Sequence, residues 1–118
     1  MIALGEETRV YLALGATDMR KSIDSLAALV VDVLQQDPCT AQVFVFCNRG
    51  RDKLKVLCWQ RNGFWLCYRR LERERFRWPS VSADASAVTV TTRELRWLLD
   101  GLQWQRMEGH REVHFRVL

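Results

Sequence analysis

The stretch that decides the fold is VFVFCNRGRDKLKVLCWQRNGFWLCYRRLERERFRWP, which runs from Val43 to Pro79. It contains three runs rich in Val, Phe, Trp and Tyr, the side chains that pack well on a pleated sheet. The runs are Val43–Cys47, Lys53–Gln60 and Phe64–Leu71, and the turn-forming residues Asn48-Arg49-Gly50 and Asn62-Gly63 separate them. The pattern therefore predicts an antiparallel meander.

The Asn62-Gly63 pair also predicts the register of the second hairpin. Asn-Gly favours a two-residue type I′ turn, in which both central residues take positive φ. Counting outward from that turn places Lys55 opposite Arg70, and like charges in this position are mildly unfavourable. Either a bound anion or a nearby acid, Asp52 or Glu72, would relieve the repulsion. The same register predicts the pairs Trp59–Leu66, Leu57–Tyr68 and Lys53–Glu72 on this face and Cys58–Cys67 on the other.

Helices are predicted on both sides of the meander in the sequence. Apolar residues recur at helical spacing over Ile23–Gln35 and stop at Asp37-Pro38, which predicts a long helix. Thr91 and Glu94 form a capping box ahead of a leucine stripe, which predicts a short second helix. Val10–Leu14 is typical of a strand or a buried extended segment. Together these patterns predict an α+β fold, a small antiparallel meander packed with one long helix before it and one short helix after it.

Length and composition indicate a single domain spanning residues 1–118. A chain of 118 residues with 48% hydrophobic content is long enough for one core and too short for two. After Arg106 the chain turns polar, and the alternation of Val113, Phe115 and Val117 is typical of either an added edge strand or a frayed tail. The chain shows no signal-peptide pattern and no apolar run near the ~20 residues of a membrane span. We therefore expect a cytoplasmic protein without membrane contact.

The sequence predicts neither a catalytic centre nor a metal or cofactor site. Its 4 cysteines show no C-x-x-C spacing, so reduced core thiols are expected. His110 and His114 lack the directly adjacent Glu of the zinc-protease patterns. Nucleophile elbows, phosphate-binding glycine loops and well-spaced carboxylate pairs are also missing from the sequence. We therefore expect that the protein is not an enzyme.

The quoted stretch is also the most basic part of the chain. It holds ten of the 18 Lys and Arg residues but only three acids, so the positive charge behind the net +4 is concentrated here. Clustered cations favour phosphate binding, and exposed aromatic faces favour base stacking. The same composition also suits a half-buried sheet whose outer face is kept soluble by Arg and Lys. Residue types alone do not separate these two interpretations.

Two sets of candidate residues follow from this composition. Arg20 and Lys21 are included because cations in a first helical turn oppose the helix dipole, which suggests an anion site. The alternative is that Asp18 caps the helix and both cations pair with acids elsewhere. The predicted DNA contacts are Arg20, Lys21, Arg49, Arg51, Lys53, Lys55 and Arg70, and the predicted stacking or protein-interface residues are Leu57, Trp59 and Tyr68.

Five short motifs occur in a specific order and spacing between Thr8 and Trp104. They are Thr17-Asp18-Met19-Arg20-Lys21 with Asp24 and Leu26, Phe44-Val45-Phe46, Lys53-Leu54-Lys55-Val56-Leu57, Asn62-Gly63-Phe64, and Arg70-Leu71-Glu72 with Phe76 and Trp78-Pro79. Taken together they resemble one known family, the small accessory protein, often called TnpB, of the insertion-sequence-66 transposons of bacteria. At Glu74 the chain departs from the family pattern, which usually has glycine there, so a tight turn is not predicted at this position.

The resemblance implies a protein encoded beside a larger transposase and required for, or assisting, transposition. It supplies no catalytic residues. We therefore expect a non-enzymatic accessory factor that contacts DNA at the element ends through the basic and aromatic ribbon. The alternative is an adaptor that binds the transposase or another accessory subunit, and a weaker third option is a nuclease-like subunit. A homo-oligomer is compatible with these readings.

Overall fold

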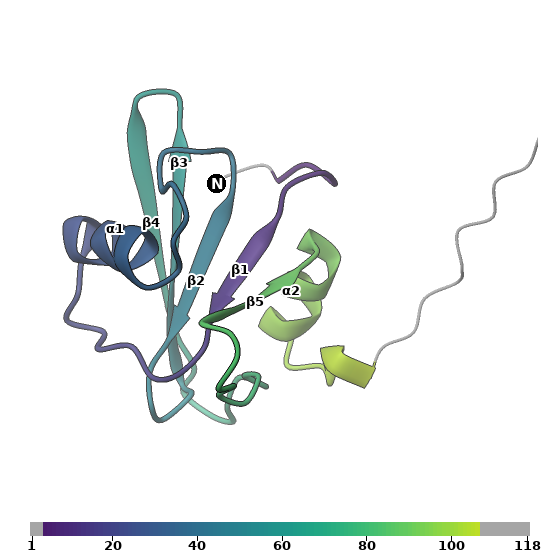
Figure 1. Cartoon of the computed structure of the whole chain (residues 1–118). Coiled ribbons are helices and arrows are strands. Elements are labelled where there is room, and N and C mark those ends of the chain that lie inside the picture. Colours follow the sequence, from purple (N-terminus) through teal and green to yellow (C-terminus); the bar gives the residue numbers. More distant parts are fainter. Residues whose placement is uncertain (1–3, 107–118) are drawn as a thin grey trace, which may run out of the picture.

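A five-stranded sheet forms the centre of the fold in the computed structural model, which describes residues 4–106 (Figure 1). The predicted antiparallel meander is confirmed as β2, β3 and β4. The sheet is larger than predicted and mixed, because β1 pairs with β2 in parallel and β5 pairs with β1 in antiparallel. Its order is β4-β3-β2-β1-β5, with β1 at Val10–Ala13, β2 at Val43–Cys47, β3 at Lys53–Gln60, β4 at Gly63–Arg70 and β5 at Ala87–Val90.

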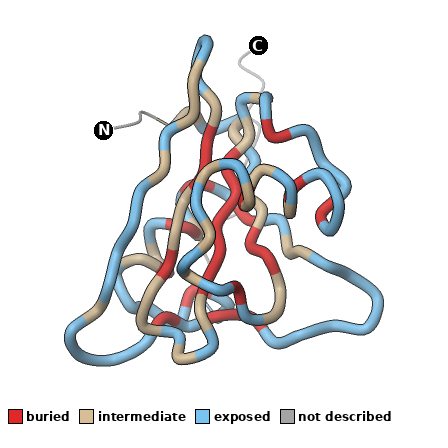
Figure 2. Tube along the Cα trace, turned by 90° about the vertical axis from the view of Figure 1, so that its left-hand side faces the viewer, coloured by how far each residue is buried: buried red, intermediate tan, exposed pale blue. Residues whose placement is uncertain are grey.

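The two helices cover opposite faces of this sheet, as Figure 1 shows. Helix α1 (Ile23–Asp32) packs on one face, and α2 (Thr92–Leu99), followed by the 3-10 turn η1 (Trp104–Arg106), packs on the other. All five residues of β2 are buried, because alternate side chains point into two separate cores. Figure 2 shows this burial along the central strands, while the loops are exposed.

Helix α1 is shorter than predicted. It spans 10 residues against 8 in α2, so the expected contrast between one long and one short helix is not seen. The Ser22 N-cap and Ser25 form a capping box at its start. At its end Gln35 takes a positive φ of 53°, and the Gln36 amide turns back to the Val30 carbonyl. The helix therefore ends at Asp32, before the predicted end at Gln35, and the left-handed Gln35 closes its C-terminus.

The predicted register of the β3–β4 hairpin is wrong by two residues, because each β3 residue pairs with the β4 residue two positions before its predicted partner. Gln60 pairs with Gly63, so the turn residues are Arg61 and Asn62, and only Arg61 has a positive φ, of 59°. The predicted faces are retained, because the partners shift by two residues and the side-chain period is two. The observed register brings two aromatic rings together across the hairpin. The observed pairing sets Phe64 edge-on to Trp59, with ring centroids 5.0 Å apart, whereas the predicted one sets Phe64 opposite Arg61.

Several predicted cross-strand pairs change as a consequence. Lys55 lies opposite Tyr68 rather than Arg70, and the like-charge pair in the sheet is Lys53 with Arg70. Cys58 faces Trp65 and Cys67 faces Val56, so the two thiols are not directly opposed. All four cysteines are free, but only Cys47 and Cys58 are core residues, since Cys39 and Cys67 are exposed.

Residues 71–79 return across the face of the sheet that α2 covers. Phe76 and Trp78 are buried there, and Trp78 Nε1 donates a hydrogen bond of 3.0 Å to the Ala13 carbonyl. Glu74 takes a positive φ of 66°, so the tight turn is present although the residue is not glycine. Strand β5 was not predicted, and residues 107–118, with Val113, Phe115 and Val117, lie outside the described residues.

Candidate nucleic-acid interface

An open groove of about 630 Å³ lies where β2 ends and β3 begins. Three segments far apart in the sequence form it: the loop before α1, the turn between β2 and β3, and the sheet face beneath α1. We call it the basic groove. It is lined by Ala16, Thr17, Asp18, Met19, Arg20, Asn48, Arg49, Gly50, Lys53 and Tyr68. Four of the predicted site residues therefore come together here, namely Arg20, Arg49, Lys53 and Tyr68.

The β2–β3 turn is fixed by the side chain of Asn48. Its Oδ1 accepts hydrogen bonds of 3.1 Å from the backbone amides of Asp52 and Lys53. Its Nδ2 donates to Asp52 Oδ1 over 2.7 Å, and this bond lowers the pKa of the Asp52 carboxyl. Arg51 completes the turn with a positive φ of 60°. Because these hydrogen bonds fix the turn, the exposed Arg49 is carried on a defined backbone at the groove rim.

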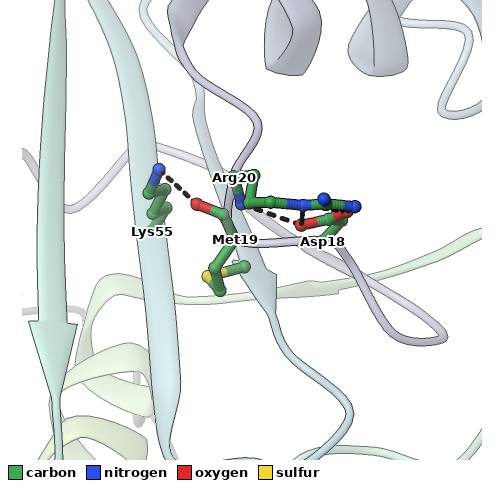
Figure 3. A network of polar contacts seen from close by, with 4 residues as sticks. All are labelled: Asp18, Met19, Arg20 and Lys55. Carbon is green, nitrogen blue, oxygen red and sulfur yellow. Dashed lines mark hydrogen bonds and ion pairs between the residues drawn. The ribbon is translucent and has the colours of Figure 1, made fainter.

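Lys55 holds the opposite wall of the groove in place. Its Nζ donates hydrogen bonds of 2.7 Å to the carbonyl of Met19 and to that of Lys21. Figure 3 shows the contact with Met19, whose neighbour Arg20 points the other way. A further bond of 2.8 Å joins the Thr17 amide to the end of β2. Lys55 is thus a positioning residue, because two of the three donors of its ammonium are committed to backbone carbonyls and not free for the predicted phosphate contact.

Arg20 and Asp18 form a forked ion pair beside the groove (Figure 3). Arg20 Nη2 lies 2.6 Å from Asp18 Oδ2, and Arg20 Nε and the Arg20 backbone amide also donate to this carboxylate. These bonds lower the pKa of Asp18 to about 2. Arg20 and Lys21 precede the helix, whose N-cap is Ser22, so neither cation lies in a first helical turn and Asp18 is not the helix cap.

The other predicted residues have different environments. Leu57 is fully buried and is unable to contact a partner, and Trp59 is half-buried against Phe64. Arg70 lies opposite Lys53 and is bound to Glu72 over 2.7 Å, which raises the pKa of Arg70. The acid expected to relieve the like-charge pair is therefore Glu72.

Arg51 lies outside the basic groove, in a second hollow of about 730 Å³ that also contains Arg75 and Arg77. Arg75 Nη1 donates to the Gly50 carbonyl over 2.6 Å, which joins this hollow to the β2–β3 turn. Sequence reasoning did not single out Arg75 and Arg77 as site residues. The sequence signal that could have identified them is their alternation with the aromatic residues Phe76 and Trp78. When aromatics at alternate positions are buried, the arginines between them point to solvent.

Neither a metal-binding cluster nor a membrane-spanning helix is found among residues 4–106. No group of three or more His, Cys, Asp or Glu side chains in that range is placed to hold a metal ion, and His110 and His114 lie beyond it. Neither helix in the same range has the length and apolar character that crossing a bilayer requires.

Comparison with known proteins identifies the family of this chain. A sequence model of the family described as IS66 Orf2 like protein matches residues 8–109. The uncharacterized protein y4hO of Sinorhizobium fredii is 39% identical over 105 residues, which cover 89% of this chain and 90% of that protein. The uncharacterized protein y4jC of the same organism is 31% identical over 108 residues, covering 92% and 91%. No solved structure matches significantly.

The match spans most of the chain, and it includes the loop before α1 and the β2–β3 turn that together form the basic groove. The family match indicates an accessory protein associated with transposition of an insertion sequence. The chain belongs to the IS66 Orf2-like family.

Proposed function

We propose that this protein is a non-enzymatic accessory factor of transposition that contacts DNA directly through the basic groove. One observation carries the proposal. Two motifs that lie far apart in the sequence, residues 17–21 and 48–55, are tied together by Lys55 and place Arg20, Arg49 and Lys53 around one open groove. Cations gathered on a pre-formed surface are what phosphate recognition requires.

The charge balance around the groove supports an anionic partner. Asp18 is the one acid among the lining residues, and Arg20 neutralises it within the ion pair. Arg49 and Lys53 make no ion pair within residues 4–106. The adjoining hollow adds Arg51, Arg75 and Arg77 with Glu74. A basic surface therefore extends to both sides of the β2–β3 turn.

The test is fluorescence anisotropy of the full chain with labelled duplex from the element ends and with scrambled duplex, across a salt series. Affinity is expected to fall steeply as salt rises, because phosphate contacts release counterions. The double variant Arg49→Ala with Lys53→Ala is expected to weaken binding and to reduce the slope of log K against log salt by about 2. Tighter binding to the element ends would add sequence recognition.

The matched control removes the same number of charges from the other side of the sheet. Arg93 and Arg96 are exposed on α2, away from the groove, so Arg93→Ala with Arg96→Ala is expected to bind DNA like the wild type. Equal losses for the two double variants would mean that net charge alone governs binding. No binding by folded protein at low salt would refute direct DNA contact.

A second candidate function is the adaptor, and one observation favours it. Trp65 is 51% exposed on the edge strand β4, beside the exposed thiol of Cys67 on the same face. Large exposed aromatics are typical anchors of protein interfaces. Co-purification with the transposase that is lost in Trp65→Ala and kept in the Arg49→Ala, Lys53→Ala variant would support this function.

A further inference from the structure

Tyr68 is the aromatic side chain of the basic groove. It lies on β4 on the face beneath α1, and it is 54% exposed. The Lys55 ammonium lies 5.7 Å from its ring centroid. Because Lys55 is held by the carbonyls of Met19 and Lys21, this contact places the ring beside a fixed cation. The ring is thus oriented, and more than half of its surface remains in contact with solvent.

The surroundings of Tyr68 differ from those of the other exposed aromatic on the same strand. Trp65 lies on the opposite face, in a hollow formed by the hairpin tip, with Arg61 as the sole cation among its lining residues. The indole nitrogen of Trp65 also donates to Gln60 over 3.0 Å. Tyr68 instead shares its groove with Arg20, Arg49 and Lys53. An exposed ring among clustered cations is the arrangement that binds unpaired nucleotides, since the bases stack on the ring and the phosphates meet the cations.

We propose that the basic groove binds an unpaired DNA strand, with a base stacked on Tyr68 and the flanking phosphates at Arg49 and Lys53. The inference rests on the proposed DNA contact and adds the form of DNA that the site takes. Bases within a duplex are stacked on both sides and have no free face for a protein ring. Tyr68 therefore contributes to affinity only where the DNA is single-stranded, as in an overhang or an opened stretch.

The experiment measures anisotropy of the full chain with three labelled DNAs: a single strand, the duplex of the same sequence, and that duplex with a single-stranded overhang. Tyr68→Ala is expected to weaken single-strand and overhang binding roughly 5- to 100-fold, the range that stacking of a base supplies. Duplex affinity is expected to stay within about two-fold, because phosphate contacts remain. A 2-aminopurine base in the strand is expected to be quenched by the wild type and not by Tyr68→Ala.

Two variants separate stacking from structural support. Tyr68→Phe keeps the ring and is expected to keep single-strand affinity, whereas Tyr68→Leu keeps apolar cover over Lys55 and is expected to lose it. Tyr68→Leu therefore also serves if Tyr68→Ala fails to fold. Trp65→Ala is the control for an equally exposed aromatic and is expected to leave all three affinities unchanged.

The outcomes distinguish the inference from the function on which it rests. Duplex binding that falls as much as single-strand binding in Tyr68→Ala, or unchanged single-strand binding in Tyr68→Leu, would overturn base stacking and leave DNA contact in place. Absence of binding to any of the three DNAs by the folded wild type would overturn both.

Discussion

Replacing Lys55 by methionine is expected to destabilise the fold, although the residue looks from the sequence like a surface cation. Its Nζ donates two hydrogen bonds of 2.7 Å, to the Met19 and Lys21 carbonyls. Hydrogen bonds involving a charged group contribute about 1.5–3 kcal/mol each, which gives an upper limit of about 3–6 kcal/mol for the two. Lys55 is only half-buried, so water replaces part of the lost bonding. We expect a loss of about 2 kcal/mol in the free energy of unfolding.

Urea unfolding followed by tryptophan fluorescence measures this loss. With a slope of about 2 kcal/mol per molar urea, typical for a small domain, the midpoint is expected to fall by about 1 M at unchanged slope. Lys53→Met is the matched control, because Lys53 lies on the same strand and the same face and its side chain makes no hydrogen bond within residues 4–106. Equal midpoints for the two variants would refute the reasoning, since they would show that the two carbonyls need no internal donor.

Three further predictions concern the backbone, an ion pair and the thiols. Glu74→Gly is expected to stabilise the fold by up to about 1 kcal/mol and Glu74→Ala is not, because glycine alone takes the observed φ of 66° without strain; equal urea midpoints would contradict this. Arg20→Ala is expected to return the pKa of Asp18 from about 2 toward its ordinary 3.8 in an NMR titration. Because the pKa of Asp18 is lower in the folded state, the ion pair stabilises the fold above pH 3.8, and this stabilisation is lost as the pH falls from 3.8 through 2. Identical Asp18 titrations in the wild type and the variant would contradict the pairing. Cys39 and Cys67 are expected to react quickly with a thiol reagent in the native protein, whereas the buried Cys47 and Cys58 are expected to react only after unfolding. A count of one or of four fast-reacting thiols would be inconsistent with the fold.

The thiol prediction depends on burial as well as on exposure. Burial raises the pKa of Cys47 to about 11 and also raises that of Cys58, so both are protonated near neutral pH. A protonated thiol is a poor nucleophile. Cys47 is also the last residue of β2, and its backbone carbonyl accepts the hydrogen bond from the Thr17 amide that anchors the groove wall.

Much of the sheet follows from local pattern. The three runs of the meander are β2, β3 and β4, and the strand over Val10–Ala13 was also indicated by its apolar run. Strand β5 escaped prediction because four residues, Ala87–Val90, follow a stretch of small residues that indicates a loop. The strand pairs with the edge of β1. Its β-branched residues Val88, Thr89 and Val90 are a local strand signal that sequence reasoning did not use.

The candidate site was predicted in part. Arg49, Lys53 and Tyr68 were named from composition and do line one groove. Lys55 and Leu57 were named by the same reasoning, yet one is committed to backbone carbonyls and the other is buried under α1. Alternation along a strand identifies which residues share a face. It does not identify which of those residues the helix covers.

The sequence by itself determined the positions of the meander strands and of both helices, the concentration of cations and the family, because these depend on residues close together in the chain. The tertiary structure alone decided the meeting of the loop before α1 with the β2–β3 turn. The hairpin register was also missed by sequence reasoning, although the Trp59–Phe64 pair that accompanies the observed register joins residues close together in the chain. The bonds from Lys55 to the loop span 36 and 34 residues, and contacts at that separation exist only once α1 and the sheet have packed together.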